Sequence, residues 1–525
     1  MPIIESLNFK QNFQYEESID KWVKRSQVID FSFSFFGVKG DGSFVAGYSE
    51  YNFNPDFTKK SFSNEILSFQ EDANKKDSTF WEKVRPVPLT EVEVEDYVKK
   101  DSLQVIRKSK KYLDSIDARG NTFKITSPLL GYSYIDTYNK KRFSISGPLQ
   151  AIGFNTVQGW NSSITADYST WSDENFTSSF SAFAKADYGI SEDRLRYTGG
   201  FAKRFNRTNR ATLRVSGGVT LSQINTAEPI KPLVNSVYTL TREENFAKYY
   251  EKVFAEAYYG QEVINGFRLD ATVAYEERNP VFNTTDQTFF PKDDKEFTSN
   301  NPLAPFDEGS AAFESHSIGK LILSGRINFG QKYYSYPDGK FNVNVDKYPS
   351  LTLVYEKGFG ASVADYDFDQ LRLFVKQEFN VGNKGRFKYD ARVGTFLGTA
   401  EDISFVDRQH FNGNETIIFD PENSNRFYNL PYYERSTNEA YFEGHAEHNF
   451  RGWILGKIPL INKLNFNLIA GAHILSTQDA SLYREFSVGL GNVGFGKFRF
   501  LRFDYVHSQG ALGGDDNAFL IGLSF

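Results

Sequence analysis

The sequence of 525 residues lacks cysteine, contains a single methionine and has no long apolar run. Without cysteine, the chain cannot form disulfide bonds, thiolate zinc sites or a cysteine nucleophile. The mean hydropathy is -0.48, and no stretch approaches the roughly twenty apolar residues of a spanning helix, so a helical membrane protein is excluded. The net charge of -6 also lacks the basic excess that sequence-independent nucleic-acid binding requires.

The sequence is rich in aromatic residues and glycine, which favour strands, interfacial girdles and bends. Its last nine residues, Asn517–Phe525, alternate between the two sides of an extended strand. The side predicted to face lipid in this barrel-closing strand consists of Phe519, Ile521, Leu523 and Phe525. We expect this last edge to pair with the first strand of an outer-membrane β-barrel.

The same period of two recurs in several segments after residue 149. In 267–276, for example, Leu269, Ala271 and Val273 alternate with Arg268, Asp270 and Thr272. Apolar rows would face lipid and polar rows the lumen, although a soluble β-sandwich also alternates. The charges predicted to line the lumen are Arg268, Asp270, Arg386, Lys388, Asp390, Arg392, Glu443, Glu447, Arg502 and Asp504.

Loop lengths favour the barrel over the sandwich, because outer-membrane barrels alternate short periplasmic turns with longer external loops. Tight connections are predicted near 172–175, 206–209, 262–266, 382–385 and 493–496. Long polar loops are predicted near 222–246, 278–315 and 398–437. The predicted fold is therefore all-β, a transmembrane antiparallel barrel of about sixteen strands, with fourteen or eighteen as alternatives.

Two further regions are predicted before the barrel, which we place at 123–525. Residues 1–57 resemble the end of a periplasmic β-rich domain, with strands at 29–36 and 42–53. Residues 58–122 are predicted to be a linker with one long helix, in which Thr90 and Glu93 form a capping box; a solvated spacer is the alternative. Residues 1–10 show no secretory signal, so we expect a mature fragment with an added initiator methionine, or a missing upstream part.

Few residues in the sequence suggest chemistry. Glu443, His445 and Glu447 share one side of a strand, where imidazole and carboxylate groups could bind a metal, but mutual pairing of lumen charges is the simpler interpretation. No Gly-x-Ser-x-Gly motif, phosphate loop or dinucleotide fingerprint is present. We therefore predict no catalytic residue, no resident metal and no cofactor.

The last third of the sequence resembles the superfamily of barrel-assembly insertases and two-partner-secretion pores. The segments that carry this resemblance are FSVGLGNVGFG (486–496), LRFDYV (501–506) and FLIGLSF (519–525). FVDRQHFNGNETIIF (405–419) lies where that superfamily folds an external loop into the barrel, but the Val-Arg-Gly-Tyr tip is absent. The resemblance implies sixteen strands and an inward-folded loop containing Phe411, Asn412, Gly413, Asn414 and Glu415.

A second resemblance covers about four hundred residues. Its segments include FWEKVRPVPLT (80–90), GFNTVQGWN (153–161), RNPVFNTTD (278–286), LPYYERSTNEAYFEGHAEHNF (430–450) and KIPLINKL (457–464). They are similar to uncharacterised Bacteroidota outer-membrane proteins, in which a carboxypeptidase-D-regulatory-like domain precedes a barrel of unknown function. The resemblance implies a location in the Gram-negative outer membrane and no peptidase activity.

We expect a non-enzymatic barrel that acts as scaffold, accessory or occluded pore in outer-membrane protein biogenesis or secretion. Its expected partners are outer-membrane lipid and other outer-membrane or periplasmic proteins, and not nucleic acid. The alternative is a passive or substrate-specific uptake porin with a cationic strip for anionic solutes. The residues of that strip are Arg210, Arg214, Arg268, Arg326, Arg372, Lys376, Arg386 and Arg392. A soluble β-protein is the third alternative, and about sixteen strands without a plug domain argue against a TonB-dependent receptor.

Overall fold

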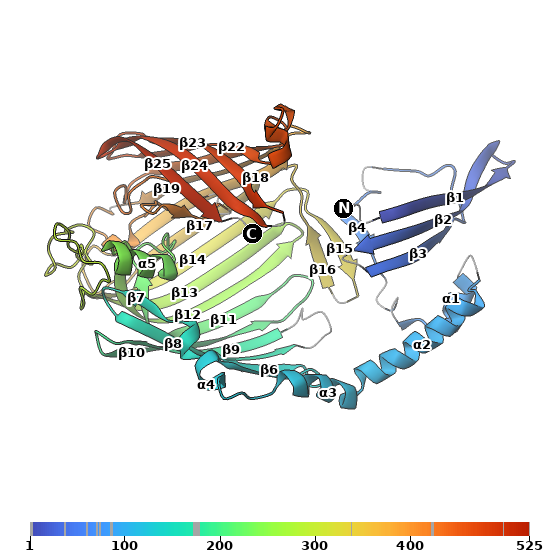
Figure 1. The fold of residues 1–525 in the computed structure, drawn as a ribbon, viewed down its shortest axis with the longest axis horizontal. Coiled ribbons are helices and arrows are strands. Elements are labelled where there is room, and N and C mark those ends of the chain that lie inside the picture. The colour runs from blue at the N-terminus through green and yellow to red at the C-terminus, as the bar shows by residue number, and fades with distance from the viewer. Residues whose placement is uncertain are drawn as a thin grey trace. The chain divides into compact units, whose positions relative to one another are not determined.

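The computed structural model describes residues 4–35, 38–58, 61–69, 72, 75–84, 88–171, 179–337, 339–398, 400–421, 425–496 and 498–523. The chain divides into two compact units (Figure 1). One unit contains Met1–Leu113 together with Tyr333–Pro337, and the other contains Asp114–Lys332 and Asp338–Phe525. The predicted turn at 172–175 and the terminal Phe525 lie outside the described residues.

The smaller unit is built on a three-stranded antiparallel sheet of β1 (Ile4–Glu16), β2 (Lys21–Phe35) and β3 (Val38–Gly47). Strand β1 was missed by the sequence analysis. Its register places Leu7 opposite Phe31 and Phe9 opposite Ile29, so the apolar side chains of β1 and β2 share one face. A fourth strand, β4 (Glu65–Ser68), pairs in parallel with β15 (Lys332–Tyr336).

Three helices follow instead of the predicted single one: α1 (Ser78–Val84), α2 (Glu91–Lys108) and α3 (Lys110–Gly120). The capping box at the start of α2 is confirmed, because Glu93 N–H donates to Thr90 Oγ1 and Thr90 N–H donates to Glu93. Ser109 explains the break between α2 and α3. Its backbone is extended, its hydroxyl donates to Ile106 O, and it accepts from Tyr112 N–H, so it caps both helices.

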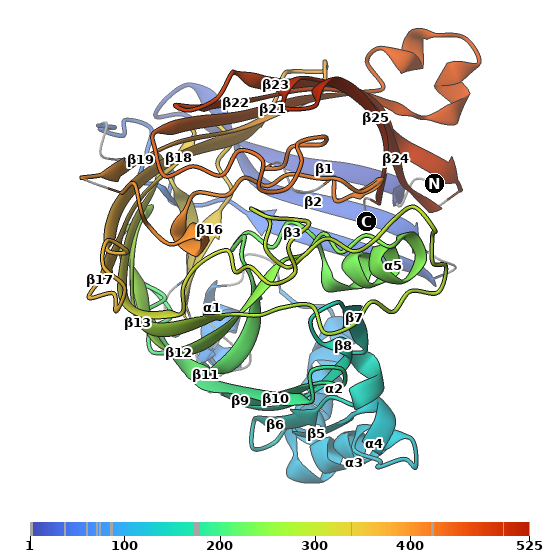
Figure 2. The same cartoon turned by 90° about the vertical axis from the view of Figure 1, so that its left-hand side faces the viewer.

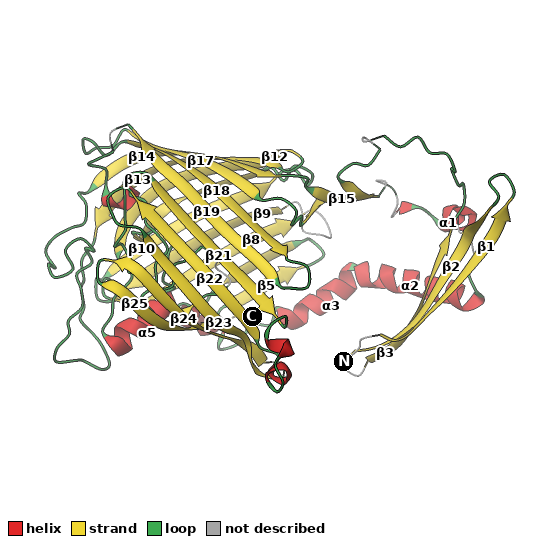
Figure 3. Cartoon of the chain, turned by 90° about the horizontal axis from the view of Figure 1, so that it is seen from above, coloured by secondary structure: helices red, strands yellow, loops and turns green. Residues whose placement is uncertain are grey.

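The larger unit is a sheet that curves into a barrel (Figures 1, 2 and 3). Within the described residues, its long antiparallel strands are β8 (Gly159–Trp171), β9 (Ser179–Gly189), β10 (Arg194–Arg204), β11 (Thr212–Gln223), β12 (Tyr249–Ile264), β13 (Phe267–Pro280), β14 (His316–Asn328), β17 (Ser350–Phe359), β18 (Phe368–Asn380), β19 (Arg386–Leu397), β21 (Tyr441–Arg451), β22 (Asn467–Thr477), β23 (Tyr483–Phe495), β24 (Phe498–Ala511) and β25 (Gly514–Leu523). Helix α4 (Ser127–Leu130) and strand β5 (Tyr132–Asp136) precede them, and β16 (Gly339–Val343) lies between β15 and β17. The predicted fold class is confirmed.

The strand before β8 is interrupted. Strands β6 (Lys141–Ile145) and β7 (Gly153–Asn155) both pair with β8, at Thr170–Ala166 and Asn161–Gly159 respectively. A 3₁₀ turn, η2 (Pro148–Gln150), separates them, because Pro148 has no N–H to donate to the ladder. The sheet contains nineteen strands among the described residues, of which fifteen are long, compared with the predicted number of about sixteen.

The prediction that the last strand closes the barrel is wrong. Within the described residues, no hydrogen-bonded register joins β25 to β5, β6 or β7. Strand β25 pairs with β24 on one side and with the short β20 (Ile418–Phe419) in parallel on the other. Residues of the loop between β19 and β21 therefore pair with part of the edge of β25 that was predicted to pair with the first strand.

The alternating rows face the sides that the sequence predicts. Outward side chains are exposed, including Val273 (53%) and Val488 (57%), whereas the inward Glu443 and Glu485 are fully buried. In β25, Phe519, Ile521 and Leu523 are exposed, and Leu520 points inward. Among the described residues of the larger unit, no second layer covers the apolar rows, which is the arrangement of a barrel in lipid and not of a soluble sandwich.

A charge in the outward row should be costly. We expect Val273→Arg, at the middle of β13, to lower the free energy of unfolding by about 2–4 kcal/mol in lipid vesicles, because arginine at the bilayer midplane loses its hydration. Denaturant titration of the refolded protein measures this. Val105→Arg on α2, where the side chain is 73% exposed, is the control and should change the stability by less than about 0.5 kcal/mol. Equal effects of the two changes would contradict a lipid-facing row.

The two rims of the barrel differ. One rim carries the long connections 224–248, 281–315 and 398–440, and the other carries the two-residue turn 265–266 and the five-residue turn 381–385. The rim with short turns is periplasmic in outer-membrane barrels. Two connections at this rim, 329–349 and 452–466, are longer than predicted. No helix among the described residues is long and apolar enough to cross a membrane.

Candidate functional site

We name residues 398–440 the plug loop, and its described parts, 398, 400–421 and 425–440, pass through the interior of the barrel at the rim with the long connections (Figure 2). Most side chains of the predicted inward-folded segment are buried: Phe411, Asn412 and Asn414 are at most 5% exposed. Gly413 is buried too, and a Cβ there would lie 2.4 Å from Leu430 O. Glu415 is exposed, and its carboxylate accepts a hydrogen bond from Tyr432 N–H at 3.0 Å.

The plug loop is attached to the barrel wall through charge. Asp407, in the 3₁₀ turn η3 (Phe405–Asp407), forms ion pairs with Arg278 of β13 and, at 3.3 Å, with Lys320 of β14. The side chains of Asp407 and Arg278 are 1% and 2% exposed. Burial alone would raise the pKa of Asp407, but the two cations outweigh it and hold the pKa at about 2. Asp407 is therefore ionised at neutral pH.

Further wall residues extend this ion pairing. Arg278 also donates to Glu276 at 2.6 Å, while Glu356 pairs with both Lys320 and Arg372. We name these residues the charge cluster: Arg278, Glu276, Asp407, Lys320, Glu356 and Arg372. Because it spans β13, β14, β17, β18 and the plug loop, it links the loop to a quarter of the barrel.

A second attachment is apolar. Phe411, Phe427 and Leu430 of the plug loop pack against Tyr441, Leu475 and Tyr483 of β21, β22 and β23. Beside this cluster, the wall carboxylate of Glu485 accepts hydrogen bonds from Tyr428 N–H at 2.7 Å and Asn429 N–H at 2.8 Å. Glu485 thus satisfies two backbone donors of the loop, one of them on the buried Tyr428.

A second external loop, 224–248, supports the plug loop. It contains α5 (Pro232–Arg242), which the sequence analysis did not predict. Ile417 N–H donates to Tyr238 Oη at 2.8 Å, and Asn225 Nδ2 donates to Phe411 O at 2.9 Å. Arg426 of the plug loop donates in return to Pro229 O. Both loops must therefore move together if the external mouth is to open.

The predicted metal candidates lie in the wall without forming a metal site. His445 Nε2 lies 2.9 Å from Glu443 Oε1, and its Nδ1 lies 2.8 Å from Nδ1 of His473 on β22. Glu447 faces Lys388 at 3.1 Å and Arg502 at 2.7 Å instead. Among the described residues, no group of three or more histidine, aspartate or glutamate side chains is arranged to hold a metal.

The predicted lumen charges lie in pairs. Arg268 bonds Asp270 at 2.9 Å, and Arg502 bonds Asp504 at 2.7 Å. The other pairs are Arg386 with Glu378, Lys388 with Glu447, and Arg392 with Asp390 and Glu443. Pairing of this kind neutralises most of the charge of these ten residues.

The periplasmic half of the lumen remains open as a cavity of about 730 Å³. Its basic lining residues outnumber its acidic ones, Asp346 and Glu378. The basic ones are Arg326, Lys376, Arg386, Lys388 and Arg451. The barrel is thus filled at the rim with the long connections, and the cavity lies at the opposite rim.

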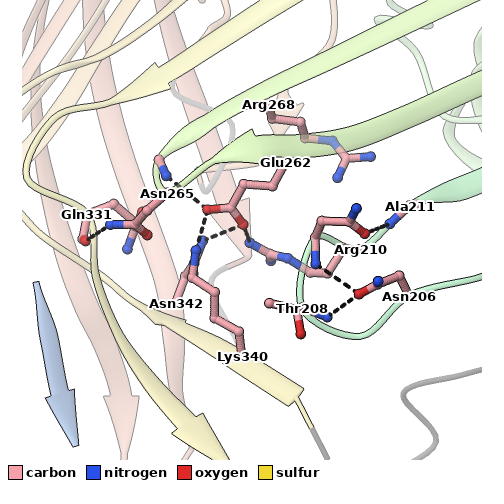
Figure 4. Close-up of polar contacts among 12 residues, drawn as sticks. Asn206, Thr208, Arg210, Ala211, Glu262, Asn265, Arg268, Gln331, Lys340 and Asn342 are labelled. Carbon is pink, nitrogen blue, oxygen red and sulfur yellow. Dashed lines mark hydrogen bonds and ion pairs between the residues drawn. The ribbon is translucent and has the colours of Figure 1, made fainter. Parts of the chain in front are cut away.

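One buried carboxylate organises the periplasmic rim (Figure 4). Glu262, at the end of β12, accepts from Arg210 at 2.8 Å, from Lys340 at 2.6 Å and from Gly266 N–H at 2.9 Å. These donors come from three different connections at this rim, so Glu262 joins two short turns to the longer connection 329–349. Arg210, predicted as part of a cationic strip, therefore pairs with Glu262, a partner that was not predicted from the sequence.

Plug attachment should depend on pH through His410. This side chain is buried between Ser436 Oγ at 2.7 Å and Phe405 O at 2.9 Å, and burial lowers its pKa to about 4. The unfolded chain binds the proton near pH 6.5, so stability rises with pH between 4 and 6.5 and is lost on acidification. We expect a loss of about 3 kcal/mol over this window.

Proteolysis of the plug loop in vesicles, followed between pH 7 and pH 4, tests the His410 prediction. Cleavage should accelerate as the pH falls, and His410→Gln should remove that acceleration. Identical pH profiles of the two proteins would show that another group controls the loop.

Comparisons with known proteins identify a family and several similar structures. The family described as "Family of unknown function (DUF5686) C-terminal domain" matches residues 126–490, and "Family of unknown function (DUF5686)" matches residues 1–51. A search of curated proteins found no match.

Solved structures similar to the chain include BamA from Haemophilus ducreyi lacking POTRA domains 1–3, at 10% identity and a TM-score of 0.40, covering 98% of this chain and 89% of that one. CdiB from Acinetobacter baumannii matches at 10% identity and a TM-score of 0.34, and the match covers 71% of this chain and 58% of that one. Pseudomonas aeruginosa OpdO matches at 11% identity and a TM-score of 0.28, and the match covers 69% of this chain and 88% of that one.

Proposed function

The chain belongs to the DUF5686 family, whose function is unknown, and we propose a role for it in outer-membrane protein biogenesis or secretion. In this role it is an occluded outer-membrane barrel that serves as a scaffold or accessory, without enzymatic turnover. The observation that carries the proposal is the plug loop, which is fixed to the wall by the charge cluster and by the apolar cluster around Phe427. A solute pore gains nothing from a filled external mouth. A barrel that presents surfaces to partner proteins is compatible with one.

The smaller unit supports the same proposal. Its helix α2 has no buried residue, and Leu7, Phe9 and Phe44 on the apolar face of its sheet are 47%, 58% and 61% exposed. Exposed apolar surface of this kind marks protein interaction sites in many proteins. We propose other outer-membrane or periplasmic proteins as the partners.

Purification from native membranes in mild detergent tests this role. Recovery of assembly or secretion components with the intact chain would support it. The control replaces Phe9 and Phe44 with serine, which should reduce recovery while the barrel remains folded. Recovery of the protein alone, in both forms, would refute the scaffold role.

The cavity at the periplasmic end favours a second candidate, a pore for anionic solutes, because basic side chains predominate in its lining. In that case the plug loop would have to leave the lumen. Large, stable, anion-selective conductance of the intact chain in planar bilayers would favour the pore over the scaffold.

A further inference from the structure

The connection between β21 and β22, residues 452–466, differs from the short turns at the periplasmic rim. It is fifteen residues long and contains two 3₁₀ turns, η4 (Leu455–Lys457) and η5 (Ile461–Leu464). Figure 2 shows that it projects outward from the ring of strands, away from the lumen. We name residues 452–466 the rim segment.

Apolar side chains of the rim segment are exposed. Leu460 is 75% exposed, and Ile458, Ile461 and Leu464 are between 36% and 46% exposed. Leu460 follows Pro459 and has a φ of 71°, a backbone conformation that is uncommon for residues other than glycine. The neighbouring β23–β24 turn adds Phe495 and Phe498, which are 90% and 74% exposed. These groups continue the lipid-facing rows of β21 to β24 beyond the ends of the strands.

The charge of the rim segment has one sign. Residues 451–466 contain Arg451, Lys457 and Lys463 and no acidic residue, in a chain with 66 acidic and 60 basic residues. Trp453 lies among these cations, with Lys457 Nζ 4.9 Å and Lys384 Nζ 5.8 Å from its ring centroid. Tryptophan and lysine together, beside exposed aliphatic groups, are characteristic of segments that lie in a membrane interface.

The rim segment is also held in place. Arg499 at the start of β24 donates to Leu464 O and, at 3.3 Å, to Asn492 O. Asn492 in turn donates to Asn465 O at 2.6 Å. The segment is therefore fixed to the adjacent hairpin in its outward position.

We propose that the rim segment is an interfacial anchor that lies in the periplasmic leaflet of the membrane. Its aliphatic side chains enter the boundary of the acyl chains, and Lys457 and Lys463 bind the headgroups of anionic phospholipids. Continuity with the lipid-facing rows and the uniform positive charge favour lipid over a second copy or another protein. The inference requires that the barrel spans a membrane, but not that it assists protein assembly.

The absence of native cysteine makes a direct test straightforward. Leu460→Cys, Leu303→Cys and Val488→Cys are each labelled with an environment-sensitive fluorophore in the full chain, which is reconstituted into vesicles of phosphatidylethanolamine and phosphatidylglycerol. Lipids with a nitroxide near the headgroup serve as quenchers for positions 460 and 303, and lipids with a nitroxide on the acyl chain serve as the quencher for position 488. Leu303, in the external loop and 59% exposed, is the aqueous control, whereas the outward Val488 of β23 reports insertion of the barrel.

We expect quenching at position 460 to approach that at 488 and to exceed that at 303 at least about twofold. In the labelled Leu460→Cys chain, an added Lys457→Gln or Lys463→Gln substitution should shift the equilibrium between the membrane-bound and the unbound rim segment about fivefold per lysine toward the unbound, unquenched state. This shift should appear only when the vesicles contain phosphatidylglycerol. If 488 is quenched but 460 is not, or if 460 is shielded from aqueous and lipid quenchers alike, the anchor is refuted. An effect independent of the lysines would refute headgroup binding. If 488 is not quenched, the membrane placement itself fails, and with it the proposed function.

Discussion

Removing the plug loop is expected to turn an occluded barrel into a conducting one. Strands β19 and β21 are already paired, with Gly394 opposite Tyr441, so a short turn can replace residues 402–436. Without the loop, the charge cluster and the apolar cluster lose their central members, β25 loses its pairing with β20, and the part of the lumen that the loop fills becomes accessible to water. We expect single-channel conductance in planar bilayers to rise at least about tenfold over the intact chain.

The control for this deletion carries Leu303→Ser and Phe306→Ser, two exposed positions in another external loop, and should behave like the intact chain. Heat-dependent migration on gels checks that each barrel is folded. A folded deletion variant that does not conduct would show that another part of the chain closes the lumen. Open channels in the intact chain would favour the pore over the scaffold.

The sequence predicts the wall of the barrel well, because the direction of a strand side chain depends on local alternation alone. The rows of β13 and β23, the tight turn after Glu262 and the capping box at Thr90 all follow from residues within a few positions of one another. Such features need no knowledge of distant contacts.

Features that join distant residues could not be predicted in this way. Asp407 meets Arg278 across 129 positions, and β20 meets β25 across about a hundred, so neither pairing leaves a periodic signal. His445 faces His473 only through the register of β21 and β22. The inward fold of residues 411–414 was predicted only from family resemblance, and the ion pair that fixes the loop was not predicted.

Neutralising Asp407 should have the largest effect of any single substitution in the plug loop. Asp407→Asn keeps the shape of the side chain but leaves Arg278 and Lys320 buried without their shared anion. Removing one partner of a buried ion pair typically costs about 3–5 kcal/mol. The pKa of Asp407 is held at about 2, below its unfolded value. In the parent protein, the stability that the ion pair contributes should therefore be complete above pH 4 and should disappear as the pH falls toward 2.

Urea unfolding of the refolded chain in vesicles at neutral pH measures this loss. Asp369→Asn is a matched control, because Asp369 pairs with Lys357 at 3.2 Å but the two side chains are 30% and 42% exposed. An exposed pair of this kind contributes at most about 1 kcal/mol. If both substitutions cost the same, the ion pair does not fasten the plug loop. If only Asp407→Asn destabilises the protein and also speeds proteolysis of residues 398–440, the loop is held in the lumen mainly by electrostatic attachment to β13 and β14.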